Sequence, residues 1–112
     1  MAEMSLKRVL AERGRSRRSR QEQARTEAWK LAAELRQRFV FHRLYLIGSL
    51  AKGRFGSQSD IDLVIQGLAP ESFFKGYAFL LKESRFPIDL KPFEDLPPEE
   101  QSRIVQEGKS LG

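Results

Sequence analysis

The sequence lacks cysteine altogether and contains a single histidine among its 112 residues. Without cysteine the chain can form no disulfide framework and no thiolate metal site. The one histidine, His42, has no partner ligand nearby in the sequence, so we interpret it as a strand-edge residue and not as a metal ligand. A protein without cysteine is compatible with a reducing compartment, and a cytoplasmic location is the simplest expectation.

Long hydrophobic runs are also missing. No apolar stretch approaches the roughly 18 residues that a membrane-spanning helix needs, and no charged-then-apolar leader is visible at the start of the sequence. The hydrophobic fraction of 40% nevertheless fits a globular protein. A length of 112 residues allows one domain with one modest core. We therefore expect a single domain and no membrane partner.

Acidic residues are too few to balance the basic ones, and the imbalance lies at one end. The net charge is +5, and residues 1–25 account for all of it with eight Lys or Arg and three Glu. We expect residues 1–21, which are rich in Arg and Ser, to form a flexible basic arm, and residues 22–112 to form the folded domain. Such an arm is either a solvated tail or a surface for RNA phosphates or an acidic partner.

Hydrophobic periodicity and runs of branched residues predict the elements of the domain. The helices are expected over residues 22–39, 70–83 and 99–108, and the strands over residues 39–48, 59–67 and 85–93. Trp29 widens the apolar side of the first helix, and burial statistics favour a core position for it. The order of the elements indicates an α/β (α+β) fold, in which a small mixed sheet is flanked by helices.

Two carboxylates, Asp60 and Asp62, open the most apolar strand. In a strand they point to the same face, about 6.5–7 Å apart along it. Paired carboxylates near a core repel each other and tend to protonate, and a divalent cation with oxygen ligands removes both difficulties. Asp89 repeats the pattern on the third strand and reaches the same face if the two strands are neighbours. Three carboxylates could hold two Mg²⁺ ions, as two-metal phosphoryl-transfer sites do.

A candidate phosphate cradle precedes these acids. Gly48 follows the first strand directly and lets a ligand approach the backbone, while Ser49 offers a hydroxyl and an amide donor. Lys52 lies within reach as a positive charge. The glycine- and serine-bearing loop that follows ends at Ser59, and it has the composition of a loop that covers phosphates.

The whole combination resembles a known signature: Gly-Ser at 48–49, ten residues, Asp-Ile-Asp at 60–62, then a third Asp on the following strand. This is similar to the DNA polymerase β-like nucleotidyltransferase superfamily. In detail, "GSLAKGRFGSQSDIDLVI" resembles the minimal nucleotidyltransferases, the MntA-like antitoxins often encoded beside a HEPN-domain toxin. The resemblance covers about residues 26–110. It implies a polymerase β palm-like fold, with metal-binding and catalytic carboxylates at Asp60, Asp62 and Asp89 and a nucleotide-phosphate turn at 48–49.

The resemblance also implies a reaction and a partner. A nucleoside monophosphate, with AMP from ATP as the expected case, would pass to a hydroxyl of the HEPN-domain toxin with the help of two Mg²⁺ ions. Lys52 stands where Arg is common in the family, which keeps the charge but loses the two-pronged hydrogen bonding. The alternative is a non-catalytic binding antitoxin or an RNA-associated module with a vestigial acidic site. Homo-oligomers and hetero-oligomers fit both interpretations.

Overall fold

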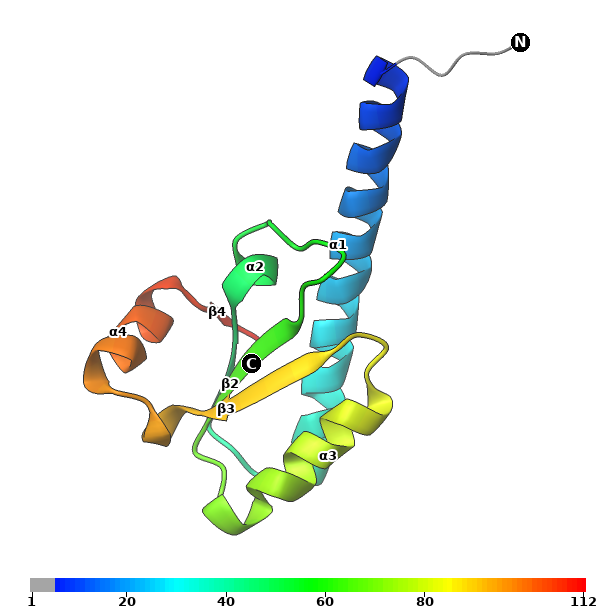
Figure 1. Cartoon of the computed structure of the whole chain (residues 1–112). Coiled ribbons are helices and arrows are strands. Elements are labelled where there is room, and N and C mark those ends of the chain that lie inside the picture. The colour runs from blue at the N-terminus through cyan, green and yellow to red at the C-terminus, as the bar shows by residue number, and fades with distance from the viewer. Residues whose placement is uncertain (1–5) are drawn as a thin grey trace.

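A four-stranded mixed sheet in the order β3-β2-β1-β4 forms the centre of the fold (Figure 1). The computed structural model describes the backbone of residues 6–112 and the side chains of residues 6–7 and 16–112. The strands are β1 (Arg43–Ile47), β2 (Ile61–Gln66), β3 (Ile88–Pro92) and β4 (Lys109–Ser110). β1 pairs antiparallel with both β2 and β4, whereas β2 and β3 run parallel. The mixed sheet expected from the sequence is therefore confirmed.

Helices flank this sheet, and they follow the predicted order with shifted ends. They are α1 (Leu6–Arg38), α2 (Gly48–Ala51), α3 (Phe73–Glu83) and α4 (Pro98–Glu107), with 3₁₀ turns η1 (Pro70–Ser72) and η2 (Phe93–Asp95). The predicted sequence of helix, strand, strand, helix, strand, helix corresponds to α1, β1, β2, α3, β3 and α4, whereas the short elements α2 and β4 were not among the predicted elements. Among residues 6–112, no helix combines the length and the apolar character needed to cross a membrane.

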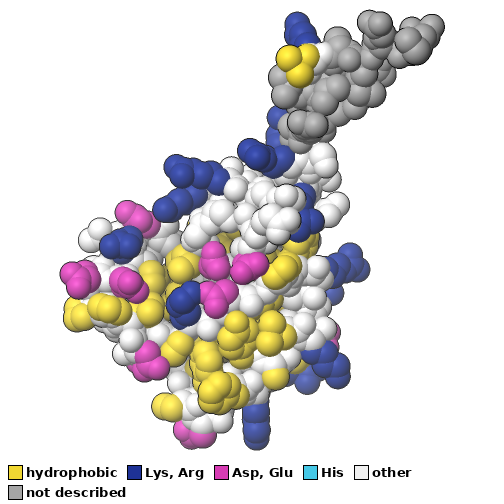
Figure 2. Space-filling model, in the orientation of Figure 1, with side chains coloured by type: hydrophobic (Ala, Val, Ile, Leu, Met, Phe, Trp, Pro, Cys, Tyr) yellow, Lys and Arg dark blue, Asp and Glu magenta, His cyan; other side chains and the backbone are white. Residues whose placement is uncertain are grey.

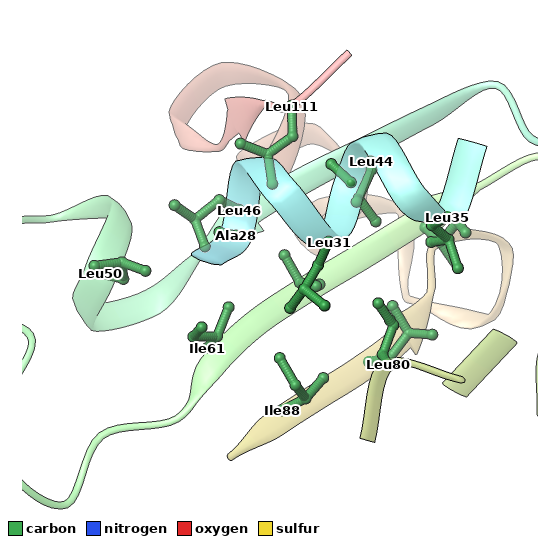
Figure 3. Close-up of a cluster of buried hydrophobic side chains, with 14 of the residues drawn as sticks. Ala28, Leu31, Leu35, Leu44, Leu46, Leu50, Ile61, Leu80, Ile88 and Leu111 are labelled. Atoms are coloured by element: carbon green, nitrogen blue, oxygen red, sulfur yellow. The ribbon is translucent and has the colours of Figure 1, made fainter. Parts of the chain in front are cut away.

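The main core lies between one face of the sheet and the helices α1 and α3 (Figures 1 and 3). Strand alternation sends every second residue to this face, and Ile61, Leu63 and Ile65 of β2 are all at most 1% exposed. α1 contributes a stripe with the three- and four-residue spacing of a buried helix face. Its members are Ala24, Ala28, Leu31, Ala32 and Leu35. The intervening β2 residue Asp62 consequently points to the opposite face.

That opposite face is only partly covered. Under α4 it holds a small cluster of Tyr45, Val64, Phe93 and Ile104, in which the rings of Tyr45 and Phe93 stack with centroids 6.1 Å apart. Beyond this cluster the face is open to solvent, and Figure 2 shows acidic side chains gathered there beside a basic one. The open part of the sheet is therefore where polar side chains can meet a ligand.

α1 differs from its expected start. It begins at Leu6 and crosses the expected arm–domain boundary at residues 21–22 without interruption, because Lys, Arg, Glu and Gln are good helix formers even without apolar partners. The N-terminal part of α1 projects beyond the body of the protein (Figure 1). Flexibility of residues 1–21 in solution stays a prediction, and residues 1–5 lie outside the described part.

The expected core position of Trp29 is wrong. Its side chain is 54% exposed, because it follows Ala28 by one residue and so lies about 100° around the helix from the buried stripe. Phe74 and Leu81 of α3 are likewise exposed, at 82% and 57%. His42 is exposed directly before β1, which agrees with the expected strand-edge position.

Candidate functional site

The structure brings Asp60, Asp62 and Asp89 to the open face of the sheet. Asp62 and Asp89 are register partners in the parallel pair β2–β3. Asp60 lies one residue before β2 and shares the face of Asp62 by strand alternation. The expectation that the second and third strands are neighbours is thus confirmed, and with it the meeting of the three carboxylates.

The electrostatics of Asp62 reflect this crowding. Burial raises the pKa of the Asp62 carboxyl above its ordinary value, and the charge of Asp89 raises it further. The ammonium of Lys91 opposes the rise, and Asp60 adds a smaller increase in the same direction as Asp89. A cation on this face would favour the charged form of Asp62 against both burial and the neighbouring carboxylates.

Sequence reasoning missed one such cation, Lys91. It follows Asp89 by two residues on β3, so both side chains point to the same face. Its Nζ donates a hydrogen bond to Oδ2 of Asp89 and forms an ion pair with it. The hydrogen bond from Lys91 to Asp89 raises the pKa of the lysine. The i, i+2 spacing in "IDLK" was the signal that could have revealed this pair.

The chemistry of the three carboxylates suits a divalent cation, but their placement around a single ion does not. Carboxylate oxygens on a partly buried face are the ligands that Mg²⁺ prefers. Within the part of the chain that the structure describes, however, no three acidic or histidine side chains are placed to hold one metal ion together. The Lys91 ammonium is paired with Asp89 and already neutralises one of the three carboxylates. Asp60 and Asp62 are left as the candidate metal ligands.

The candidate phosphate turn lies against the same acids. Ile47, the last residue of β1, is the register partner of Asp62, so the next residue, Gly48, stands beside the Asp62 carboxylate. Gly48 has a φ of 74°, in the left-handed region that a side chain disfavours. A Cβ atom at this position would overlap the Asp62 carboxylate oxygen Oδ2. Ser49 follows in α2 and is half-buried.

Lys52 and Ser59 lie at the two ends of the loop between the phosphate turn and the acids. Lys52 is exposed at the end of α2. The Ser59 hydroxyl accepts a hydrogen bond from the Gly56 amide at 2.9 Å, so in this structure it stabilises the loop itself. Lys52 is therefore accessible to a ligand, whereas Ser59 makes a hydrogen bond within the loop.

Residues of α1 hold the same loop from outside. The Phe55 amide donates to Oε1 of Gln21 at 3.1 Å. The Arg20 guanidinium donates to the carbonyl oxygens of Gly56 and Ser57, both at 3.4 Å. It also lies over the Phe55 ring at 5.7 Å from the ring centroid. The segment assigned to the basic arm thus contributes directly to the shape of the loop beside the site.

A cavity of about 270 Å³ adjoins the acids between α2, β3 and α4. Its lining contains Gly48, three cationic residues (Lys52, Lys91 and Arg103) and two acidic ones (Glu100 and Glu107). Apolar side chains of Ile47, Leu96 and Ile104 complete much of the wall. Arg103 was missed by sequence reasoning, because only the packing of α4 beside β1 brings it here and no local pattern signals that packing.

Comparison with known proteins identifies what the chain is similar to. A sequence model of the nucleotidyltransferase domain family matches residues 29–111. No curated protein sequence matches the chain significantly. A toxin–antitoxin crystal structure with AMP-PNP is 20% identical over 75% of this chain and 72% of that chain, with a TM-score of 0.63.

Two further solved structures are mutants of the toxin–antitoxin MntA-HpeT. A double Asp-to-Glu mutant is 17% identical over 75% of this chain and 71% of that chain, with a TM-score of 0.61. A Tyr-to-Ala mutant is 23% identical over 74% of this chain and 69% of that chain, with a TM-score of 0.60. At these identities the likeness establishes a shared fold.

Proposed function

Since the chain belongs to the nucleotidyltransferase domain family, we propose that it transfers a nucleoside monophosphate from a nucleoside triphosphate to a hydroxyl group. The observation that carries this proposal is the face on which Asp62 and Asp89 are register partners, with Gly48 against Asp62. Nucleotidyl transfer needs carboxylates beside a turn that accommodates phosphates, because catalysis is mainly positioning and charge neutralisation.

In this proposal Asp60 and Asp62 hold Mg²⁺, which when bound neutralises charge on the triphosphate. Asp89 faces the acceptor and takes the proton of its hydroxyl. The hydroxyl oxygen forms a bond to the α-phosphorus as the bond from that phosphorus to the bridging oxygen breaks, and pyrophosphate leaves. Each of these groups lies at the end of β1 or at the start of β2 or β3, so the short chain can supply all of them.

We assign the nucleotide to the cavity beside Gly48. We assign the β- and γ-phosphates to the turn of Gly48 and Ser49, with the charge of Lys52 nearby. The apolar wall formed by Leu96 and Ile104 suits a base or ribose. The cavity volume of about 270 Å³ lies just below the usual range of ligand pockets, roughly 300–1,000 Å³, so part of the nucleotide would lie outside the cavity.

ATP is the proposed nucleotide, and a toxin is the proposed acceptor. The shared fold with a toxin–antitoxin solved with AMP-PNP supports both parts. We further propose that the acceptor is a HEPN-domain toxin. Transfer of AMP to a hydroxyl group of this toxin would inactivate it, and the chain would thereby act as an antitoxin. The Lys91–Asp89 ion pair favours one alternative, a non-catalytic antitoxin that works by contact, because it occupies a carboxylate that catalysis would use.

Mass spectrometry of the protein encoded beside this chain, after incubation with Mg²⁺ and each of the four nucleoside triphosphates in turn, tests the proposal. We expect a mass increase of one nucleoside monophosphate on a hydroxyl side chain, largest with ATP. The matched control is the variant Asp60→Asn with Asp62→Asn, which should give no increase. An unmodified neighbour with all four nucleotides, in a complex that still forms, would favour the binding antitoxin.

A further inference from the structure

Lys91 brings a fixed positive charge onto the acidic face. Its backbone is held in β3 opposite Val64 of β2, a residue that is 0% exposed. Its side chain lies on the same side of the sheet as Asp89 and contacts that carboxylate. It also lines the cavity beside Gly48. Lys91 therefore contacts one of the acids and also borders the proposed nucleotide site.

We propose that Lys91 replaces one of the two divalent cations expected at such a site, so that the protein binds a single Mg²⁺ together with its nucleotide. The inference rests on the proposed function and deepens it by fixing the metal content. Lys91 then acts as a positioning residue: it pairs with Oδ2 of Asp89, and Asp60 and Asp62 are left for the ion.

The charges of the site favour one ion. Three carboxylates and one ammonium leave the protein side of the site with a formal charge of −2, against −3 without Lys91, and the triphosphate adds the same charge in both cases. Lys91 therefore supplies part of the positive charge that a second ion would otherwise bring. A second ion on Asp89 would have to displace the ammonium or share the carboxylate with a like charge a few ångströms away, and like charges at that distance repel strongly at a partly buried site. The ion pairs among the described residues are Lys91–Asp89 and Lys30–Glu34. Asp60 and Asp62 are thus not committed to a side-chain cation.

The test counts ions and does not measure catalysis. Equilibrium dialysis with Mn²⁺ and saturating AMP-PNP gives the number of protein-bound ions per protein-bound nucleotide. Electron paramagnetic resonance distinguishes an isolated Mn²⁺ from a spin-coupled pair. We expect one uncoupled ion for the wild type, two coupled ions for Lys91→Ala, and one for Lys91→Arg, which keeps the charge. Lys109→Ala removes an exposed lysine of β4 and should behave as the wild type.

Two coupled ions in the wild type, or fewer than two in a folded Lys91→Ala protein, would overturn the inference. Circular dichroism of each variant verifies the fold, which we expect to persist because the Lys91 side chain is 48% exposed. If neither Mn²⁺ nor AMP-PNP binds to any variant, the proposed nucleotidyltransferase function itself fails. The experiment therefore separates failure of the metal count from failure of the function.

Discussion

Gly48 and Asp62 are packed so closely that a methyl group on the glycine would overlap the aspartate carboxylate. The antiparallel pairing of β1 with β2 produces this contact, because it sets Ile47 opposite Asp62. The end of one strand and the start of the next thereby form a single site, although ten residues separate the Gly-Ser and Asp-Ile-Asp segments in the sequence.

Gly48→Ala should harm both stability and nucleotide binding. The left-handed backbone at this position costs about 1–2 kcal/mol for a residue with a Cβ, and the new methyl group must push the Asp62 carboxylate aside. Urea denaturation and titration with Mg²⁺ and AMP-PNP measure the two effects. Gly76→Ala is the matched control in α3, where a Cβ would lie an ordinary 3.6 Å from Leu68. It should be neutral or stabilising by about 0.5–1 kcal/mol. Equal behaviour of the two variants would contradict the assignment.

Asp62→Asn should stabilise the metal-free protein at neutral pH. Burial and the neighbouring Asp89 raise the pKa of Asp62 in the folded state, so the folded state binds the proton more tightly than the unfolded state. The free energy of unfolding of the wild type therefore falls as the pH rises from the ordinary carboxyl pKa through the raised one. Asparagine removes this loss. Thermal unfolding with EDTA should show a higher midpoint for the variant at pH 7 and a smaller difference at pH 3. A variant less stable than the wild type at pH 7 would disprove this account.

Arg20→Ala should loosen the loop between the phosphate turn and the acids. The guanidinium contacts the carbonyl groups of Gly56 and Ser57 and the ring of Phe55, and its loss should cost about 1 kcal/mol locally. Hydrogen exchange across residues 53–59 should accelerate about fivefold, with smaller changes in the sheet. Arg18→Ala removes the same charge from an exposed position and should leave exchange unchanged. Identical exchange in both variants would show that α1 does not hold the loop.

Leu31→Ala and Trp29→Ala should differ sharply in stability. Leu31 is 0% exposed in the main core, so its truncation should cost about 2–5 kcal/mol. Trp29 is 54% exposed, and its truncation should change the free energy of unfolding by at most about 0.5 kcal/mol. Urea denaturation of the two variants measures the difference. A larger loss for Trp29→Ala would mean that the helix face is assigned incorrectly.

The sequence was sufficient for the order of the six longer elements, but not for the short α2 and β4, and it placed the three acids on one face. Period-two alternation identified the inward side of β2, and the same rule placed Asp62 outward. The buried side of α1 was harder to predict than that of β2, because an error of one residue on a helix rotates a side chain by about 100°. That rotation separates the exposed Trp29 from the buried Ala28.

Contacts between distant segments could not be predicted in the same way. Arg103 reaches the cavity only through the packing of α4 beside β1, and β4 pairs with β1 over just two residues. The pairing of Lys91 with Asp89 was within reach of the sequence, since the two share a strand face. It was missed because the acidic pattern alone suggested metal ligands, without regard to the cation two residues away.

Label transfer from ATP to the protein encoded beside this chain tests the central claim most directly. ATP labelled with ³²P at the α-position and at the γ-position is supplied with Mg²⁺ in parallel reactions, to the wild type and to the Asp60→Asn, Asp62→Asn double variant. The account predicts that the partner acquires the α-label, that the γ-label leaves as pyrophosphate, and that the double variant transfers neither. Transfer of the γ-label, or equal α-labelling by the double variant, would contradict it.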